Sequence, residues 1–193
     1  DLDADPINSK IPIDRSDSSF LSYMIEIEAS IKAVHGTLYR GILSNASHYR
    51  QEDDRHAGAV WFGGQDPFYR TIGRFQGSKP ADIQSHVRDA VVAYIDNRED
   101  PLKAVCMFYQ QFVQTHPFYD ANGRIARLIA SYFLRKHGLE IRWSEMEGKN
   151  NEFIRRLNAV HKHANFPAPY IRYLASYVRK FTHEVAMLGS TSD

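Results

Sequence analysis

The strongest constraint on the fold is a pair of amphipathic helical patterns separated by only a few residues. Apolar side chains recur at spacings of three and four from Leu102 to Val113, and again from Ile125 to Phe133. Asp100-Pro101 places a capping side chain and a first-turn proline before the first pattern. Pro117 follows that pattern and disfavours helical geometry in the preceding residue. The sequence therefore predicts two hydrophobic helices joined by a short loop.

Similar patterns predict further elements along the chain. The apolar pattern from Ser18 to Val34 predicts an N-terminal helix that ends at Gly36, and Tyr39–Tyr49 favours a second, shorter helix. We expect the segment 51–67 to be a loop. Phe68–Gly77 mixes aromatic residues, Thr and Ile with glycines, which favours a short hairpin. Additional helices are predicted at 83–95, 153–161 and 170–181.

Together these patterns predict an all-α, mostly helical fold with one small β-hairpin. Residues 1–17 are polar and aperiodic, so we expect a flexible N-terminal arm there. The N-terminal helices would occupy 18–66, and the core of the fold 67–193. The sequence contains no internal repeat and no linker long enough to divide it further.

The composition argues against several classes of function. Lys+Arg 24 against Asp+Glu 23 leaves a net charge of +1 with no basic block, so we expect no nucleic-acid partner. The apolar stretches are well short of the roughly 18 to 20 residues that a membrane span requires. Cys106 is the single cysteine and cannot form an internal disulfide, which favours a reducing compartment. No secretory segment follows Asp1, and a cytoplasmic location is expected.

The segment His116–Arg127, HPFYDANGRIAR, carries the candidate chemistry. Ala121-Asn122-Gly123 falls where the second helix begins, and there unpaired N–H groups and the positive end of the helix dipole favour an anion. Gly123 has no Cβ to keep a phosphate away from the backbone. Arg124 and Arg127 are three residues apart, so their guanidinium groups share about one helix face. This combination suits a di- or triphosphate.

Two further residues of this segment suggest catalysis. Asp120 offers a hard oxygen ligand for Mg²⁺ held against phosphate oxygens, and His116 could take a proton from an attacking hydroxyl near neutral pH. These are ingredients of phosphoryl or nucleotidyl transfer. Each residue also has a purely structural interpretation: His116 as a helix end, Asp120 or Asn122 as a cap, and the arginines as surface charges. Phe118 is most simply explained as a core anchor that fixes the loop.

The same segment resembles the signature of the Fic domain, His-Pro-Phe, any residue, Asp or Glu, Gly or Ala, Asn-Gly-Arg, any two residues, Arg. Every fixed position is present, with Ala121 in the place that takes Gly or Ala. FYRTIGRFQG at 68–77 resembles the flap hairpin of that family, and NEFIRRL at 151–157 resembles the segment that helps to line its adenine pocket. The resemblance implies an all-α core with one small hairpin.

The resemblance also implies a role for each motif residue. His116 would deprotonate a Ser, Thr or Tyr hydroxyl on a protein, and Asp120 would bind Mg²⁺ between the α- and β-phosphates of ATP. Arg124 would clamp the β-phosphate, and Arg127 would reach the γ-phosphate. The implied nucleotide-binding residues are Ala121, Asn122, Gly123, Arg124, Arg127 and Phe153. The expected product is a protein hydroxyl that carries AMP, with release of pyrophosphate.

Gly123 bears on the type of reaction. Relatives that resemble the Doc toxin kinase carry Lys in its place, a change associated with the reverse orientation of the nucleotide. Gly123 therefore favours nucleotidyl transfer, and we expect a protein adenylyltransferase. The alternatives are removal of AMP from a modified protein, or transfer of another nucleotide, by the same site. A non-enzymatic nucleotide-binding module is least favoured because His116 and Asp120 are both present.

The flap suggests how a target is held, because a hairpin edge can pair with an extended segment through main-chain hydrogen bonds. The flap residues are Thr71, Ile72, Gly73, Arg74, Phe75, Gln76 and Gly77. We expect the partner to be a protein with an accessible hydroxyl, including the chain itself. Neither nucleic acid nor a membrane is expected as a partner, and oligomerisation is left open.

An inhibitory helix is a further implication of the resemblance. Many Fic proteins carry one that reads Ser or Thr, three residues, Glu, then Gly or Asn. Ser22 and Glu26 meet the spacing, whereas Ile27 departs from the pattern. If the resemblance holds, Glu26 would neutralise Arg127 and exclude a productive γ-phosphate; the alternative is a solvent-facing glutamate on an amphipathic helix. Phe153 stands where relatives often have Tyr, which leaves the base selectivity open.

Overall fold

The computed structural model describes residues 18–51, 60–62, 75–147, 151–164 and 167–187. The chain folds into two compact units, residues 1–49 and 50–193. Helices make up most of the described residues, which confirms the predicted mostly helical class. The arm predicted at 1–17 lies outside the described residues.

The first unit contains helix α1, Ser18–Tyr39. The predicted end at Gly36 is wrong, because α1 continues to Tyr39. A Cβ on Gly36 would lie 1.8 Å from the Ser47 hydroxyl oxygen, so this glycine permits a close approach rather than a helix end. The true terminator is Gly41, whose φ of 81° is the left-handed conformation typical of a glycine just past a helix.

The helix predicted at Tyr39–Tyr49 is also wrong, because a series of turns follows α1. The Leu43 N–H donates to the Tyr39 carbonyl at 2.9 Å, which closes the first of them. Ser47 then has a φ of 73°, and its N–H donates to His35 Nδ1 at 3.1 Å. Positive φ values interrupt a right-handed helix, so the segment cannot continue as one.

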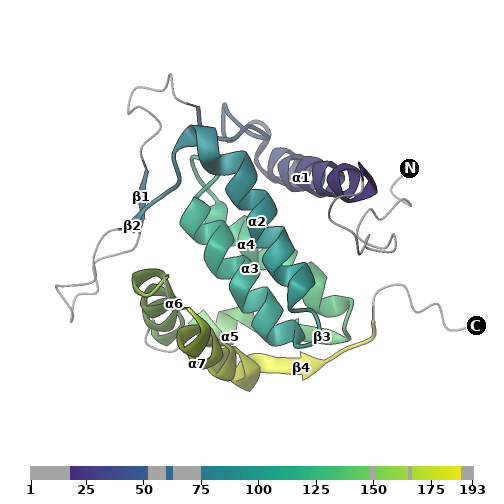
Figure 1. The fold of residues 1–193 in the computed structure, drawn as a ribbon, viewed down its shortest axis with the longest axis vertical. Helices are drawn as coiled ribbons and strands as arrows, with labels where there is room; N and C mark the ends of the chain where they lie inside the picture. The colour runs from purple at the N-terminus through teal and green to yellow at the C-terminus, as the bar shows by residue number, and fades with distance from the viewer. Residues whose placement is uncertain (1–17, 52–59, 63–74, 148–150, 165–166, 188–193) are drawn as a thin grey trace, which may run out of the picture. The chain divides into compact units, whose positions relative to one another are not determined.

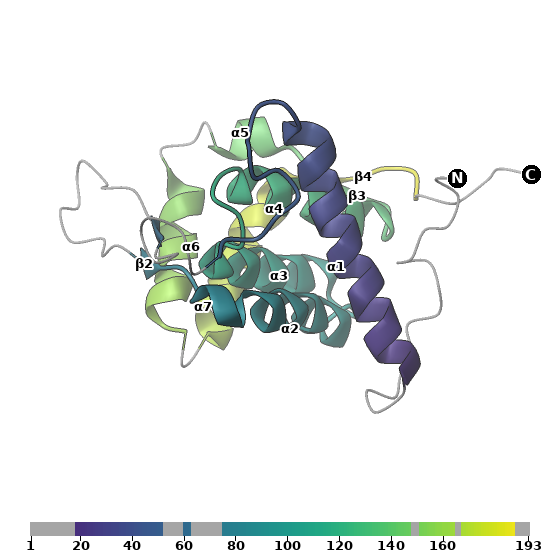
Figure 2. The ribbon, with the colours of Figure 1, turned by 90° about the horizontal axis from the view of Figure 1, so that it is seen from above.

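The helices of the second unit confirm the predicted positions to within a few residues. They are α2 (Ile83–Asp96), α3 (Pro101–Thr115), α4 (Asn122–Arg135), α6 (Glu152–Lys162) and α7 (Ala168–Val178), with short 3₁₀ helices at Pro80–Asp82 and Arg179–Phe181. Helix α3 packs against α2, α4, α6 and α7 (Figure 1), and Figure 2 shows it between α2 and α4. It contributes Phe108 and Phe112, both fully buried, to the core. None of the described helices has the length and apolar character needed to cross a bilayer.

The predicted hairpin is present, but one of its strands lies outside the predicted segment. Strand β1, Trp61–Phe62, pairs antiparallel with β2, Phe75–Gln76. Because β1 falls within 51–67, the prediction that this whole segment is loop is wrong. Flap residues Thr71–Arg74 lie outside the described residues. The Gly77 N–H extends the pairing by donating to the Val60 carbonyl at 2.8 Å.

A second two-stranded sheet and a short helix were not predicted. Strand β3, Leu139–Ile141, pairs antiparallel with β4, Thr182–Glu184, and α5 spans Trp143–Glu147. The Val185 N–H continues the ladder to the Gly138 carbonyl at 2.9 Å. Elements this short show no detectable periodicity, and the pairing joins segments far apart in the sequence.

The N-cap of α3 gives a test of this fold. The Lys103 N–H donates to the Asp100 carboxylate at 3.2 Å. We expect Asp100→Ala to lower the free energy of unfolding by about 1 kcal/mol, because an orphan N–H at the start of α3 loses its acceptor. Asp82 precedes α2 without a side-chain capping bond, so Asp82→Ala is the matched control and should cost less. Urea unfolding measures both, and equal losses would contradict the assignment.

Candidate active site

The motif segment forms the loop between α3 and α4, and a left-handed residue stands at each end of it. His116 has a φ of 52° and Ala121 a φ of 67°. A left-handed conformation costs a residue other than glycine about 1 to 2 kcal/mol, so the surrounding contacts must hold the loop. The small Cβ of Ala121 limits the steric cost, which explains why glycine or alanine suits this place.

A reciprocal pair of hydrogen bonds closes the loop. The Phe118 N–H donates to Asn122 Oδ1 at 2.9 Å, and Asn122 Nδ2 donates to the Phe118 carbonyl at 2.8 Å. The Phe118 side chain is fully buried and its ring lies 6.5 Å from that of Phe112. Phe118 is therefore the core anchor that the sequence predicted, and Asn122 fixes its backbone.

The first turn of α4 has the features expected of an anion-binding backbone. No side chain caps this helix end, and an α-helix leaves its first N–H groups without acceptors inside the helix. A Cβ on Gly123 would meet only the Tyr109 hydroxyl, at 3.9 Å, so the approach to the backbone is open. Arg127 Nε donates to the Gly123 carbonyl at 3.3 Å, which keeps this guanidinium beside the same turn.

Asp120 lies at the entrance to α4, where its carboxylate has two contacts. One oxygen accepts the Ala121 N–H at 2.6 Å, and the other lies 3.5 Å from Arg124 Nη2. Both side chains are more than half exposed, so this ion pair can exchange for other ligands. The described residues contain no cluster of three metal-ligating side chains. A single exposed carboxylate suits Mg²⁺ that is held mainly by phosphate oxygens and water.

The imidazole of His116 is kept neutral by its surroundings. Burial lowers its pKa to about 4, and the positive charge of Arg50 acts in the same direction. A hydrogen bond to the backbone of Val113 and the charge of Asp120 oppose this shift only in part. At neutral pH the ring therefore has a nitrogen able to accept a proton, as a general base requires.

Arg50 belongs to the site, although the sequence did not single it out. The side chain is 2% exposed, and its Nε donates to the His116 carbonyl at 2.6 Å. Its Nη2 donates to the Ser78 carbonyl at 2.7 Å and to the Thr115 carbonyl at 3.3 Å. The Arg50 N–H donates to the Pro117 carbonyl at 3.0 Å. A lone arginine in a segment without periodicity offered no signal for these contacts.

An aromatic cluster connects the predicted base-binding residue to the loop. The Phe153 ring lies edge-on to Tyr109, at 5.4 Å, and to Trp143, at 6.1 Å. Tyr109 and Trp143 stack at 5.7 Å. Because the Tyr109 hydroxyl also faces Gly123, the cluster adjoins the first turn of α4. Phe153 itself is 3% exposed, so its predicted contact with a base requires the cluster to open.

The end of the flap packs against α6 and against His116. The Phe75 ring lies 5.1 Å from the His161 ring of α6. A Cβ on Gly77 would lie 3.0 Å from His116 Cβ, so a side chain there would press on the loop. Beyond Gly77, Ser78 Oγ lies 2.6 Å from His86 Nδ1. The structure thus brings Gly77 against His116, while Gln76 is exposed on β2.

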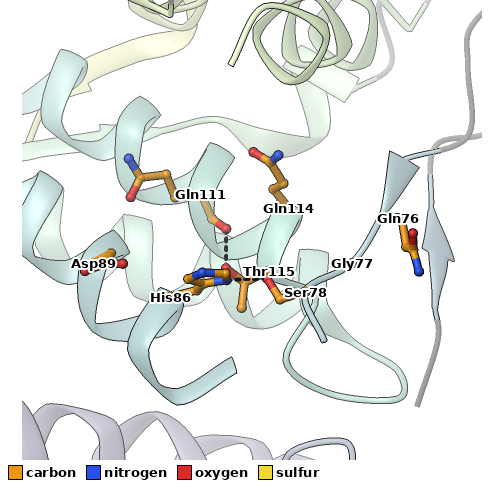
Figure 3. A pocket seen from close by; sticks show the side chains of 8 residues that line it. All are labelled: Gln76, Gly77, Ser78, His86, Asp89, Gln111, Gln114 and Thr115. Carbon is orange, nitrogen blue, oxygen red and sulfur yellow. Dashed lines mark hydrogen bonds between the residues drawn. The ribbon is translucent and has the colours of Figure 1, made fainter. Parts of the chain in front are cut away.

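A polar pocket of about 360 Å³ lies between α2, α3 and the chain that leaves β2 (Figure 3). Asp89 of α2 and Gln111 and Gln114 of α3 line it, together with Gly77 and Ser78. No residue of the motif segment 116–127 lines this pocket. The pocket is therefore separate from the first turn of α4.

Glu26, the predicted inhibitory residue, is exposed on α1 in the first unit. The Ser30 hydroxyl donates to the main-chain carbonyl of Glu26 at 2.9 Å, a bond that does not involve the Glu26 carboxylate. Arg127 belongs to the second unit. Pairing between Glu26 and Arg127 stays a prediction.

The Asn122–Phe118 pair makes a prediction about stability. We expect Asn122→Ala to lower the free energy of unfolding by about 3 kcal/mol, because two buried main-chain groups lose their partners. Arg124→Gln, two residues along the same helix, removes an exposed ion pair and should cost less than about 1 kcal/mol. Chemical denaturation compares the two variants. Equal, small losses would show that the reciprocal bonds do not hold the loop.

The His116 environment makes a prediction about titration. The Cε1 proton resonance of His116, assigned by its absence in His116→Ala, should move with a midpoint near pH 4. The ordinary midpoint for a histidine is about 6.5. A histidine whose pKa is lowered by burial and a nearby cation is neutral throughout the range between these values. A midpoint at or above 6.5 would contradict the electrostatic assignment.

Comparison with known sequences places the motif in a family. The family model described as Fic/DOC family matches residues 25–134. Uridine 5'-monophosphate transferase of Xanthomonas campestris pv. campestris (strain 8004) is 39% identical over 59 residues, which are 31% of this chain and 10% of that protein. The chain therefore spans only a small part of this curated relative.

Solved structures resemble the fold. A Fic family protein from Desulfovibrio desulfuricans G20 matches with a TM-score of 0.61 and 22% identity, over 83% of this chain and 48% of that one. A Fic domain containing signaling protein from Bacteroides thetaiotaomicron VPI-5482 matches with a TM-score of 0.56 and 19% identity, over 80% of this chain and 60% of that one. The Fic/DOC family model covers more than half of the length of this chain, so the chain belongs to the Fic/DOC family.

Proposed function

We propose that this protein transfers a nucleoside monophosphate from a nucleoside triphosphate to a hydroxyl group of a protein. The observation that carries the proposal is one loop that ends in an uncapped helix N-terminus and begins with a neutral histidine. Arg124 and Arg127 add positive charge on the first turns of the same helix. An anion-binding turn next to a base is what nucleotidyl transfer requires.

In the proposed reaction, His116 takes the proton from a Ser, Thr or Tyr hydroxyl as its oxygen attacks the α-phosphorus. A new P–O bond forms, the bond between the α-phosphorus and the bridging oxygen breaks, and pyrophosphate leaves. Arg124 and Arg127 hold the β- and γ-phosphates and balance the charge that develops on the leaving group. Asp120 would hold Mg²⁺, which supplies further neutralisation of phosphate charge.

Hydrogen bonds within the loop bear on two of the proposed nucleotide contacts. Both polar atoms of the Asn122 side chain bond to Phe118, so we assign its contact with phosphate to the main-chain N–H. The Ala121 N–H bonds to Asp120, so Ala121 acts through the left-handed turn that it makes before α4. Gly123 remains the point of closest approach to the nucleotide.

We propose ATP as the nucleotide and AMP as the transferred group, with UTP as the specific alternative. Phe153, Tyr109 and Trp143 form an apolar aromatic cluster beside Gly123, and stacking on such rings is possible for every base. The similarity to a protein named as a uridine 5'-monophosphate transferase favours UTP as the second candidate. The open surroundings of Gly123 are consistent with transfer of the nucleotide rather than of the terminal phosphate.

We propose that the target pairs with the flap at Gln76. The Gly77 N–H bonds to the carbonyl of Val60, just before β1, and main-chain groups alternate in direction along a strand. The N–H and carbonyl of Gln76 therefore point away from β1, where an extended target segment could pair with them. A segment of this chain itself is one such target, which makes self-modification a proposed outcome.

Labelling tests the proposed function. The chain is incubated with Mg²⁺ and each of the four nucleoside triphosphates carrying label in the α- or the γ-phosphate. We expect α-label from ATP on protein, and its loss of about 10² to 10⁴-fold in His116→Ala, the range typical for removal of a general base. His183→Ala, an exposed histidine of β4 outside the motif, is the matched control and should retain labelling.

The remaining outcomes separate the alternatives. Label from α-UTP in place of α-ATP would select the second nucleotide. Transfer of γ-label would identify a kinase and contradict the proposal. Glu26→Gly should label more strongly than wild type if Glu26 restrains the site; equal labelling would remove the inhibitory role. Loss of label from a pre-labelled target, without any transfer, would favour the reverse reaction.

A further inference from the structure

Arg50 occupies the place where three parts of the second unit meet. Its guanidinium donates to the carbonyls of Thr115 and His116, at the end of α3, and to that of Ser78, just after β2. Its main-chain N–H donates to the Pro117 carbonyl, next to the same helix end. One buried side chain thus connects the base-bearing loop to the exit of the flap.

The chemistry of these acceptors explains why an arginine is suited to this position. The last carbonyls of a helix have no partners inside the helix and form the negative end of its dipole. The planar guanidinium presents several N–H donors in fixed directions, so it can reach carbonyls on two segments at once. A lysine would keep the charge but lacks this geometry.

The junction around Arg50 is closely packed. The Ser78 N–H donates to the Thr115 carbonyl at 3.1 Å, which adds a direct main-chain bond between the two segments. A Cβ on Gly77 would lie 3.2 Å from Arg50 Nη2 as well as 3.0 Å from His116 Cβ. The spacing between β2 and His116 is therefore fixed by contacts that leave no room for a side chain.

We propose that Arg50 is a positioning residue that holds the main chain of His116 at a fixed spacing from the exit of the flap strand β2. The inference rests on the proposed function, in which the flap presents a hydroxyl to His116. With the spacing fixed, an acceptor hydroxyl paired along β2 meets the imidazole at a defined distance. The hydrogen bonds described for Arg50 all go to main-chain carbonyls, so its proposed role is to position the chain.

Three variants test the proposal. Arg50→Met keeps the apolar stem and removes every donor, and Arg50→Lys restores the charge without the planar fork. Gly77→Ala leaves Arg50 in place and crowds the same junction. Arg172→Met, which removes an exposed arginine of α7, is the matched control.

The first readout needs no activity. Hydrogen exchange at the Ser78 amide should accelerate in Arg50→Met relative to core amides of α2 such as Val87, with a smaller effect in Arg50→Lys and none in Arg172→Met. Unchanged protection of Ser78 in folded Arg50→Met would overturn the proposal. If Arg50→Met does not fold, Gly77→Ala decides, because it too should release the Ser78 amide.

The second readout is kinetic and uses the labelling reaction with saturating nucleotide. We expect kcat per folded molecule to fall about 10²-fold in Arg50→Met, the scale of an ångström-sized misplacement, while KM for the nucleotide changes little. Arg50→Lys should recover part of the loss. Wild-type kcat per folded molecule in Arg50→Met would overturn the positioning role. Absence of labelling in both wild type and Glu26→Gly would instead refute the proposed function, and hydrogen exchange would still decide the role of Arg50.

Discussion

The reciprocal hydrogen bonds between Asn122 and Phe118 hold the shape on which the rest of the candidate site depends. They close a loop whose end residues, His116 and Ala121, both adopt left-handed conformations that cost free energy. Direct packing of α3 against α4 sets the relative position of the two helices, and this closure fixes the path of the loop between them. The bonds thus fix one short loop that begins at His116 and ends at the first turn of α4, and they engage the Asn122 side chain within that loop.

Burial determines the protonation state of His116. The His116 ring has a pKa lowered to about 4 mainly because its charged form loses water, and the buried charge of Arg50 adds to this. A base that stays neutral at pH 7 is always available, at the cost of a weaker affinity for the proton it removes. Arg124 and Asp120 differ from it, because both side chains are more than half exposed and their ion pair contributes little free energy.

The sequence was most informative where structure is local. Asp100-Pro101 predicted the start of α3 correctly, because a cap depends on residues next to each other. The helix end predicted at Gly36 was wrong because that prediction also used only neighbouring residues. The missing side chain of Gly36 instead permits the close approach of Ser47. The pairing of β3 with β4 and the contacts of Arg50, 66 residues from His116, depend on tertiary structure and left no local pattern.

The sequence predicted the motif residues as a group, but it could not predict the separate role of each side chain. The sequence grouped Asn122 with the phosphate-binding residues, and the structure shows its side chain bonded within the loop.

The central claim, that this loop transfers a nucleotide with His116 as base, is tested most directly by tandem mass spectrometry. Glu26→Gly and its His116→Ala double variant are incubated with Mg²⁺ and an equimolar mixture of the four nucleoside triphosphates. The account predicts a nucleoside monophosphate on a protein hydroxyl in the first variant alone; phosphate alone, or the same adduct in both variants, would contradict it.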